Sequence, residues 1–243
     1  MRIPRLLLSS SISYFFPPLC VLCKSLELDS KFALCESCQS KLEEVSGPIC
    51  PRCGDPNSTN QLKAHSCQDC LKAKLPFEIC RSIFSLKKPF SDLLYLFKFK
   101  NSELCLDFFT QKLADKIPGF LQSADYLLPV PSHWFTLIRR GYNPSLILAK
   151  ALSRKIKVPV EFSALKRVKL GSAQKTLNRQ QRLKNIRNVF RLAKKHPFKN
   201  KKVLLIDDVY TTGATLIECA KLLKNAGAEV YGLTLARTPL EFS

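Results

Sequence analysis

The chain has 243 residues, which is enough for one medium-sized domain and one small domain. Hydrophobic residues make up 46% of it, so a substantial core can form, and no apolar run reaches the length that spans a bilayer, which excludes a membrane-spanning protein. Lys and Arg number 39 against 19 Asp and Glu, a net charge of +20. Such a charge favours polyanionic partners, although it can also serve solubility alone.

The N-terminal segment, residues 1–19, resembles a secretory signal because it combines two arginines with an apolar stretch. Serines interrupt that stretch, and its Phe-Phe-Pro-Pro ending lacks the small residues of a cleavage site. We therefore expect a lead-in segment of the mature chain. A cytoplasmic protein follows from this interpretation, with cysteines that are reduced or bound to metal.

Eight of the eleven cysteines fall into four CxxC pairs within the first 75 residues. Each CxxC turn presents two thiolates to one metal ion, and two turns complete a tetrahedral site. The surrounding segment is rich in turn residues and poor in large apolar ones, so metal binding would supply the folding free energy that a core cannot. The sequence predicts a small double zinc ribbon over residues 1–75 with two structural zinc ions. The expected ligands are Cys20, Cys23, Cys35, Cys38, Cys50, Cys53, Cys67 and Cys70.

A redox dithiol module is the rival interpretation of these pairs, but redox CxxC motifs usually occur singly at a helix start. The grouping of the ligands is open between sequential and interleaved pairs. Sequential grouping is the simpler one, because each ribbon then closes one short loop. Cys80, Cys105 and Cys219 lie in apolar patterns and are expected in the core.

The remainder of the chain, 76–243, alternates apolar strand patterns with helical ones. We expect strands at 79–86, 125–130, 203–206 and 229–235, and helices at 90–100, 104–117, 144–156 and 212–226. This alternation indicates an α/β domain with a parallel sheet and right-handed crossovers. Ligands of such sheets bind at the carboxyl ends of the strands.

Two basic segments lie between the expected strands. In the first, a strand that ends at Pro131 is followed by Arg139, Arg140 and the tripeptide Gly141-Tyr142-Asn143. The second falls within 163–205, which holds fourteen Lys or Arg and no acid, Lys175 and Arg179 among them. A run of this kind is usually a solvated face, but its place beside a strand end favours a flap that faces an anion.

The segment Val203 to Thr215, VLLIDDVYTTGAT, carries the most specific motif. After an apolar strand come two carboxylates, which could accept hydrogen bonds from a diol or hold water on magnesium. A Thr/Gly loop then leads into a helix, and loop amides, hydroxyls and the positive helix end can hold a phosphate. The alternative is an ordinary strand-turn-helix whose threonines are caps. The candidate residues are Asp207, Asp208, Thr211, Thr212, Gly213, Ala214 and Thr215.

This motif resembles the fingerprint of the type I phosphoribosyltransferases, which bind 5-phosphoribosyl-1-pyrophosphate (PRPP). Taken with the CxxC ribbons, the Val-Pro segment at 130–131, the run 140–143 and the polar residues of 174–185, nearly the whole chain resembles the ComF family of bacterial competence proteins. It departs from the family pattern at 134–136, where arginine is common in the family, and at Pro144, which replaces a glutamine.

The resemblance implies a type I phosphoribosyltransferase-like domain over 76–243. The loop 211–215 would hold the 5-phosphate of PRPP, and Asp207 and Asp208 the ribose hydroxyls, as the catalytic pair. Magnesium would bridge ribose and pyrophosphate. The expected clamp on the pyrophosphate consists of Arg139, Arg140, Lys175 and Arg179.

Two function classes remain open. One is a competence and DNA-uptake protein that binds single-stranded DNA through residues 166–202, keeps a PRPP site, and has competence-machinery proteins as further partners. The other is a phosphoribosyltransferase for an unidentified small-molecule acceptor; turnover is open under both. The sequence has no RRM, KH or helix-turn-helix signature, so DNA contacts are expected to be phosphate neutralisation, aided by base stacking on Phe190 or Trp134.

Overall fold

The structure is a computed structural model of the chain. It describes residues 19–26, 32–56, 65–72, 75–99, 105–117, 119–169, 186, 188–193 and 198–238. The lead-in segment before residue 19 and the candidate ligands Lys175 and Arg179 lie outside this part of the chain.

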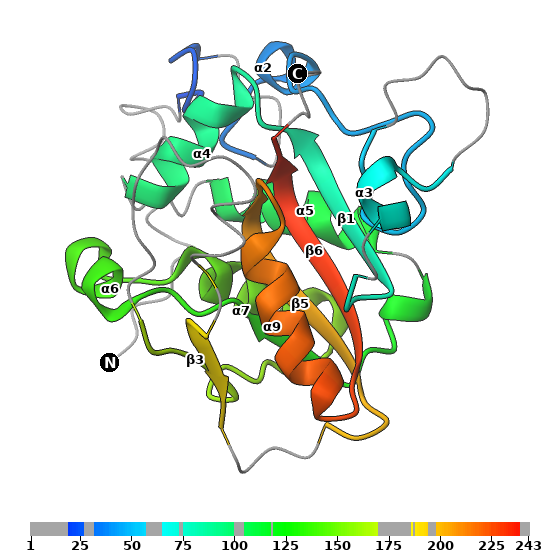
Figure 1. Cartoon of the computed structure of the whole chain (residues 1–243). Coiled ribbons are helices and arrows are strands. Elements are labelled where there is room, and N and C mark those ends of the chain that lie inside the picture. Colours follow the sequence, from blue (N-terminus) through cyan, green and yellow to red (C-terminus); the bar gives the residue numbers. More distant parts are fainter. Residues whose placement is uncertain are drawn as a thin grey trace.

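A four-stranded parallel sheet in the order β1-β6-β5-β2 forms the centre of the protein (Figure 1). Its strands are β1 (Ile79–Ser85), β2 (Tyr126–Pro129), β5 (Lys202–Tyr210) and β6 (Glu229–Arg237). Because all pairs are parallel, the carboxyl ends of β2, β5 and β6 meet at one edge. The predicted α/β class with a parallel sheet is confirmed.

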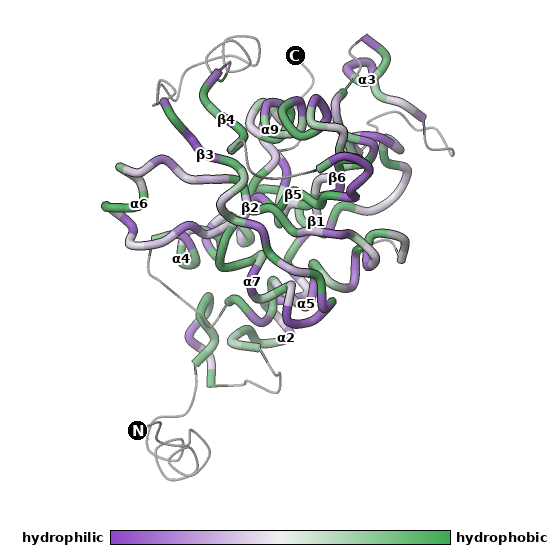
Figure 2. Tube along the Cα trace, turned by 90° about the horizontal axis from the view of Figure 1, so that it is seen from below, coloured by the Kyte–Doolittle hydropathy of each residue, from purple (hydrophilic) through white to green (hydrophobic). Residues whose placement is uncertain are grey.

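Helices cover both faces of the sheet, and Figure 2 shows the resulting layers edge-on. On one face lies α9 (Ala214–Asn225); on the other lie α5 (Leu106–Lys116) and α7 (Pro144–Ile156). Residues of β5 alternate between the two cores. Leu204 and Ile206 pack with α5 and α7, whereas Val203 and Leu205 pack with α9. Because a central parallel strand is buried on both faces, its sequence is one continuous apolar run.

The cysteine-rich segments lie on opposite faces of this sheet, around the short helices α2 (Glu36–Ser40) and α3 (Gln68–Lys72) (Figure 2). The first packs into the core that contains α5, where Phe32 meets Phe108 edge-on at 5.5 Å between ring centroids. The second shares the core that contains α9. Since each ribbon shares a core with the sheet, the boundary expected at residue 75 stays a prediction.

Several elements differ from the expectation. Helix α6 (Trp134–Arg140) was not expected, and the basic segment contributes a small antiparallel pair, β3 (Leu165–Arg167) with β4 (Phe190–Leu192). Helix α4 (Phe90–Phe99) lies where it was expected, and the 3₁₀ turn η2 (Gly119–Leu121) precedes β2.

Two expectations need correction. Strand β5 continues to Tyr210 because Asp207 and Val209 still pair with β6, so both carboxylates lie within the strand and not after it. Phe190 is 2% exposed, so its ring cannot stack on DNA bases, whereas Trp134 is 60% exposed. The predicted burial of Cys80, Cys105 and Cys219 is confirmed. Within the described residues, no helix is both long and apolar enough to cross a bilayer.

Candidate functional site

The two adjacent carboxylates lie near the carboxyl end of β5, and each has a different partner. The hydroxyl of Ser145, in the first turn of α7, donates to Oδ1 of Asp207 at 2.9 Å, and the amide of Asp208 donates to the same oxygen at 2.9 Å. Lys98, near the end of α4, forms an ion pair with Oδ2 of Asp208 at 2.8 Å. Two helices distant in sequence, α4 and α7, thus approach this acidic pair.

Burial raises the pKa of Asp207 to about 7, and the negative charge of Asp208 adds to this effect. The Asp208 amide, the Ser145 hydroxyl and the Lys98 ammonium act in the opposite direction. A carboxyl group that titrates near neutrality beside a second carboxylate is typical of functional sites. A cation or a hydrogen-bond donor that arrives here would shift Asp207 toward its ionised form.

The loop from Thr211 to Gly213 connects β5 to α9 directly after the acidic pair. Gly213 adopts φ 73°, in the left-handed region, and precedes the first residue of the 12-residue helix α9. The Thr212 hydroxyl accepts a hydrogen bond from the Ala214 amide at 3.4 Å, while Thr211 is exposed and Thr215 half-buried. This loop and the helix N-terminus provide amides, hydroxyls and a positive dipole end for an anion.

A neighbouring loop after β2 is tied to the acidic pair through α7. Asn143, the N-cap of α7, accepts from the Ser132 hydroxyl at 3.0 Å and donates to the Val130 carbonyl at 3.0 Å. Its Oδ1 also accepts from the Ser145 amide at 3.1 Å. Residues 143–145 therefore link the loop after β2 to Asp207 on β5 at the carboxyl edge of the sheet.

Among the predicted cationic ligands, the structure describes the side chain of Arg140, whose guanidinium lies 4.4 Å from the ring centroid of Phe99. Phe99 follows Lys98 on α4, so Arg140 contacts the same helix end that supplies the partner of Asp208. The side chain of Arg139 lies outside the described part, as do Lys175 and Arg179.

Three residues at this edge were not predicted: Lys98, Ser145 and Arg167. Burial lowers the pKa of Arg167, and electrostatic interactions with Cys219 and with Asp207 of the acidic pair oppose that shift. Its Nε atom has no hydrogen-bond partner among the described residues. The sequence feature that could have identified Arg167 is its place at the start of the basic segment. For Lys98 and Ser145 the sequence contains no local signal, since packing alone brings them to the site.

The eight paired cysteines form two clusters, one from the first and second CxxC pairs and one from the third and fourth. Within each cluster the sulfur atoms all lie within 4.8 Å of one another. The sulfurs of Cys23 and Cys35 are 3.6 Å apart, as are those of Cys53 and Cys67. This is the sequential grouping that the spacing favoured.

The donor chemistry of both clusters fits zinc. Burial disfavours the thiolates of Cys20 and Cys50, but backbone amides outweigh it and lower the pKa of Cys20 to about 6 and that of Cys50 to about 7. Burial raises the pKa of Cys38, Cys53 and Cys70 in the same clusters. The amides of Cys35 and Cys67 approach these two sulfurs at 3.5 and 3.4 Å. Four sulfur donors with amide support match a structural zinc site.

Two family models match separate parts of the chain. The family model of the double zinc ribbon domain matches residues 11–71, and that of the phosphoribosyl transferase domain matches residues 143–237. A purine phosphoribosyltransferase structure from Pyrococcus horikoshii superposes on 54% of this chain and 71% of its own, with a TM-score of 0.36 and 22% identity.

Relatives match over almost the full length. Competence protein F of Haemophilus influenzae is 35% identical over 91% of this chain and 99% of its own length. DNA utilization protein YhgH of Escherichia coli K12 is 30% identical over 91% of this chain and 98% of its own length. Competence protein ComFC of Bacillus subtilis is 27% identical over 84% of this chain and 84% of its own length. The chain therefore belongs to the ComF family, with a double zinc ribbon and a phosphoribosyltransferase domain.

Proposed function

We propose that this protein binds PRPP with magnesium at the carboxyl end of β5. The observation that carries the proposal is the continuous run of an acidic pair, a Thr/Gly loop and a helix N-terminus at the edge where the strands of a parallel sheet end. The same residues match the phosphoribosyltransferase fingerprint, and the family model of that domain covers them.

The site offers complementary groups to each part of PRPP. The loop Thr211 to Thr215 would hold the 5-phosphate, and Asp207 and Asp208 would accept hydrogen bonds from the ribose hydroxyls and hold magnesium through its water ligands. Lys98 already places an ammonium 2.8 Å from Asp208, which shows that this carboxylate accepts a cation. Bound magnesium would neutralise charge on the pyrophosphate.

Cations would complete the pyrophosphate side of the site. Arg139, Arg140, Lys175 and Arg179 are the proposed clamp. We add Arg167, because its charge interacts with that of Asp207. In a transfer reaction, an acceptor nucleophile forms a bond to ribose C1 while the C1–O bond breaks and its electron pair leaves with pyrophosphate. The protein would stabilise that leaving charge and needs no covalent nucleophile.

Calorimetric titration with PRPP and magnesium tests the site. The double variant Asp207→Ala with Asp208→Ala should lose binding, and Asp107→Ala, which changes an exposed carboxylate on α5, should bind as the unchanged protein does. An unchanged PRPP affinity in the double variant would show that the site lies elsewhere.

We propose further that the protein acts in the cytoplasm and binds single-stranded DNA with little sequence preference. Support comes from the names of its relatives, which are competence and DNA utilization proteins, from the net charge of +20, and from the basic segment 166–202. The exposed ring of Trp134 is available for base stacking, and the zinc ribbons could add contacts. Other proteins of the DNA-uptake machinery are proposed partners.

Salt dependence of oligonucleotide binding tests this second part. If roughly four to six cations engage phosphates, the log–log slope should be about −3 to −4, from ~0.7 per single-strand contact. Charge reversal of Arg182, Lys184 and Arg187 should weaken binding equally for all sequences and leave the zinc content intact. Absence of binding at low salt would favour a phosphoribosyltransferase for a small-molecule acceptor, and pyrophosphate release from PRPP with and without DNA separates the two functions.

A further inference from the structure

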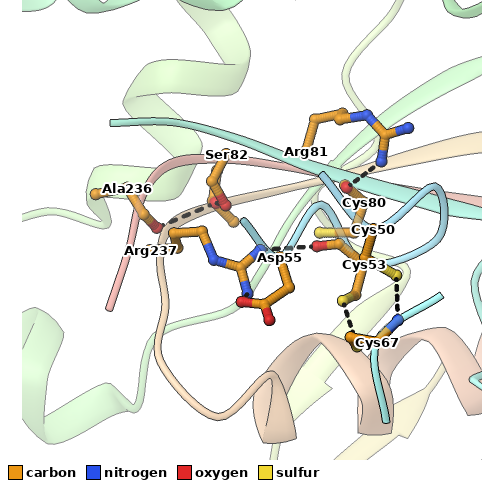
Figure 3. A network of polar contacts seen from close by, with 10 residues as sticks. Cys50, Cys53, Asp55, Cys67, Cys80, Arg81, Ser82, Ala236 and Arg237 are labelled. Carbon is orange, nitrogen blue, oxygen red and sulfur yellow. Dashed lines mark hydrogen bonds and ion pairs between the residues drawn. The ribbon is translucent and has the colours of Figure 1, made fainter. Parts of the chain in front are cut away.

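Arg237, the last residue of β6, joins the second cysteine cluster to the core. Its Nη2 atom forms an ion pair with Oδ1 of Asp55 at 2.6 Å, and its Nη1 atom donates to the carbonyl of Cys53 at 3.0 Å (Figure 3). Arg237 is 3% exposed and Asp55 5% exposed. A buried guanidinium held by two groups of one metal-binding turn depends on the position of that turn.

The position of Asp55 is set by that turn. The Cys50 amide donates to the Asp55 carbonyl at 2.7 Å, and the Gly54 amide donates to the Cys50 carbonyl at 2.9 Å. Asp55 therefore belongs to the same tight turn that presents the Cys50 and Cys53 sulfurs. Since a bound metal orders such a turn, it also orders the carboxylate that holds Arg237.

Arg237 is in turn connected to the end of β5. It pairs with Tyr210 in the β5–β6 ladder, and its guanidinium carbon lies 5.2 Å from the Tyr210 ring centroid. The amide of Thr238 donates to the Tyr210 carbonyl at 3.0 Å. Tyr210 is the residue directly before the Thr/Gly loop, so its place sets where that loop begins.

The side chain of Tyr210 also lies against the loop itself. A Cβ atom at Gly213 would overlap the Tyr210 hydroxyl, which shows how closely the ring packs under the loop backbone. Thr211 and Tyr210 line a small pocket together with Cys53, Cys67 and Cys70 of the second cluster. The cluster and the loop are thus direct neighbours.

We infer that the second cysteine cluster is part of the phosphate site, with Arg237 as the positioning residue that connects Asp55 to Tyr210 and the loop 211–213. Loss of metal from this cluster releases Asp55, shifts Arg237 and Tyr210, and disorders the loop. The first cluster has no such role, because it packs on the opposite face of the sheet, where Glu44 forms ion pairs with Lys112 and Lys116. The part of this inference that is tested by PRPP affinity rests on the proposed function.

Asp55→Asn and Glu44→Gln form a matched pair, since each neutralises one carboxylate that ties the cysteine-rich region to the sheet domain. Asp55→Asn should keep both zinc ions and weaken PRPP binding at least about tenfold, because loss of one partner of a buried ion pair leaves the Arg237 guanidinium uncompensated and displaces it. Glu44→Gln should bind PRPP normally. Arg237→Lys can keep the ion pair with Asp55 but not the hydrogen bond to the Cys53 carbonyl, so it should retain part of the PRPP affinity.

Cys70→Ser and Cys38→Ser remove one ligand from the second and first cluster. Hydrogen exchange of the Ile217 amide, which donates to the Gly213 carbonyl at 2.8 Å, reports on the loop without any ligand. Exchange there should become faster in Cys70→Ser and in Asp55→Asn, and stay unchanged in Cys38→Ser.

Equal exchange at Ile217 in the two cysteine variants, or wild-type exchange in Asp55→Asn, would overturn the inference. If the unchanged protein does not bind PRPP, the proposed function fails, but the exchange measurement still decides whether the second cluster orders the loop.

Discussion

Ser145 and Asp207 stand 62 positions apart in the chain, yet the Ser145 hydroxyl lies 2.9 Å from the Asp207 carboxylate. The serine is held in place because Asn143, two residues earlier, caps α7 and is itself bound to the loop after β2. Through this contact the N-terminus of α7 influences the charge state of a half-buried carboxyl group on β5. The hydrogen bond favours the ionised form of Asp207, against the effect of burial.

Replacement of Ser145 by alanine should therefore weaken PRPP binding at pH 7 by about tenfold, since hydrogen bonds to charged groups contribute roughly 1.5–3 kcal/mol. The loss should shrink at pH 9, where Asp207 is ionised in both proteins. Ser153→Ala, a half-buried serine on the same helix, is the control. A loss that is equal at both pH values would show that Ser145 does not act through the ionisation of Asp207.

Binding of PRPP and magnesium should release a proton from Asp207 near neutral pH. Because the pKa of Asp207 is raised to about 7, the carboxyl group is largely protonated below that pH and must ionise to hold a cation. Affinity should fall as pH drops below 7, by at most about tenfold per pH unit for one proton. Calorimetry in two buffers with different heats of ionisation gives the number of protons that are released when PRPP binds.

Asp207→Asn is the control for this proton count. PRPP carries phosphate groups that titrate near pH 6, and the variant retains their contribution while it removes that of Asp207. An identical proton count in the variant and the unchanged protein would contradict the assignment.

The purified protein should contain about two zinc ions per chain, held by the eight paired cysteines. Because each ribbon shares a core with one face of the sheet, chelation of the metal should also lower the thermal stability of the whole protein. Metal analysis and a thermal melt measure both effects. Zinc near zero in a folded protein whose eight thiols titrate freely would rule this out.

The local patterns of the sequence predicted most of the sheet and both metal clusters. Strand β5 is an apolar run between polar residues, and the CxxC turns carry their own spacing, so neither depends on distant contacts. Helix α6 was not predicted because its seven residues are too few for apolar periodicity to identify a helix. Its large apolar residues Trp134, Phe135 and Ile138 are exposed.

The candidate site was predictable only where its residues follow one another. Asp207, Asp208 and the loop 211–215 are contiguous, so the motif revealed them together. Lys98 and Ser145 reach the acidic pair from other helices, and their approach depends on how α4 and α7 pack on the sheet. No pattern within either helix distinguishes these residues from ordinary surface lysines and serines.

Gly213 and Gly47 allow a last prediction that separates backbone strain from close packing. Both have positive φ, 73° and 81°, so alanine at either position costs roughly 1–2 kcal/mol. A Cβ at Gly47 meets no atom within 4 Å, whereas one at Gly213 overlaps the Tyr210 ring, which adds about 1–3 kcal/mol. Gly213→Ala should therefore lower the thermal midpoint more than Gly47→Ala, and only Gly213→Ala should lose PRPP binding. Equal midpoints would mean that Tyr210 moves away without cost and does not support the loop.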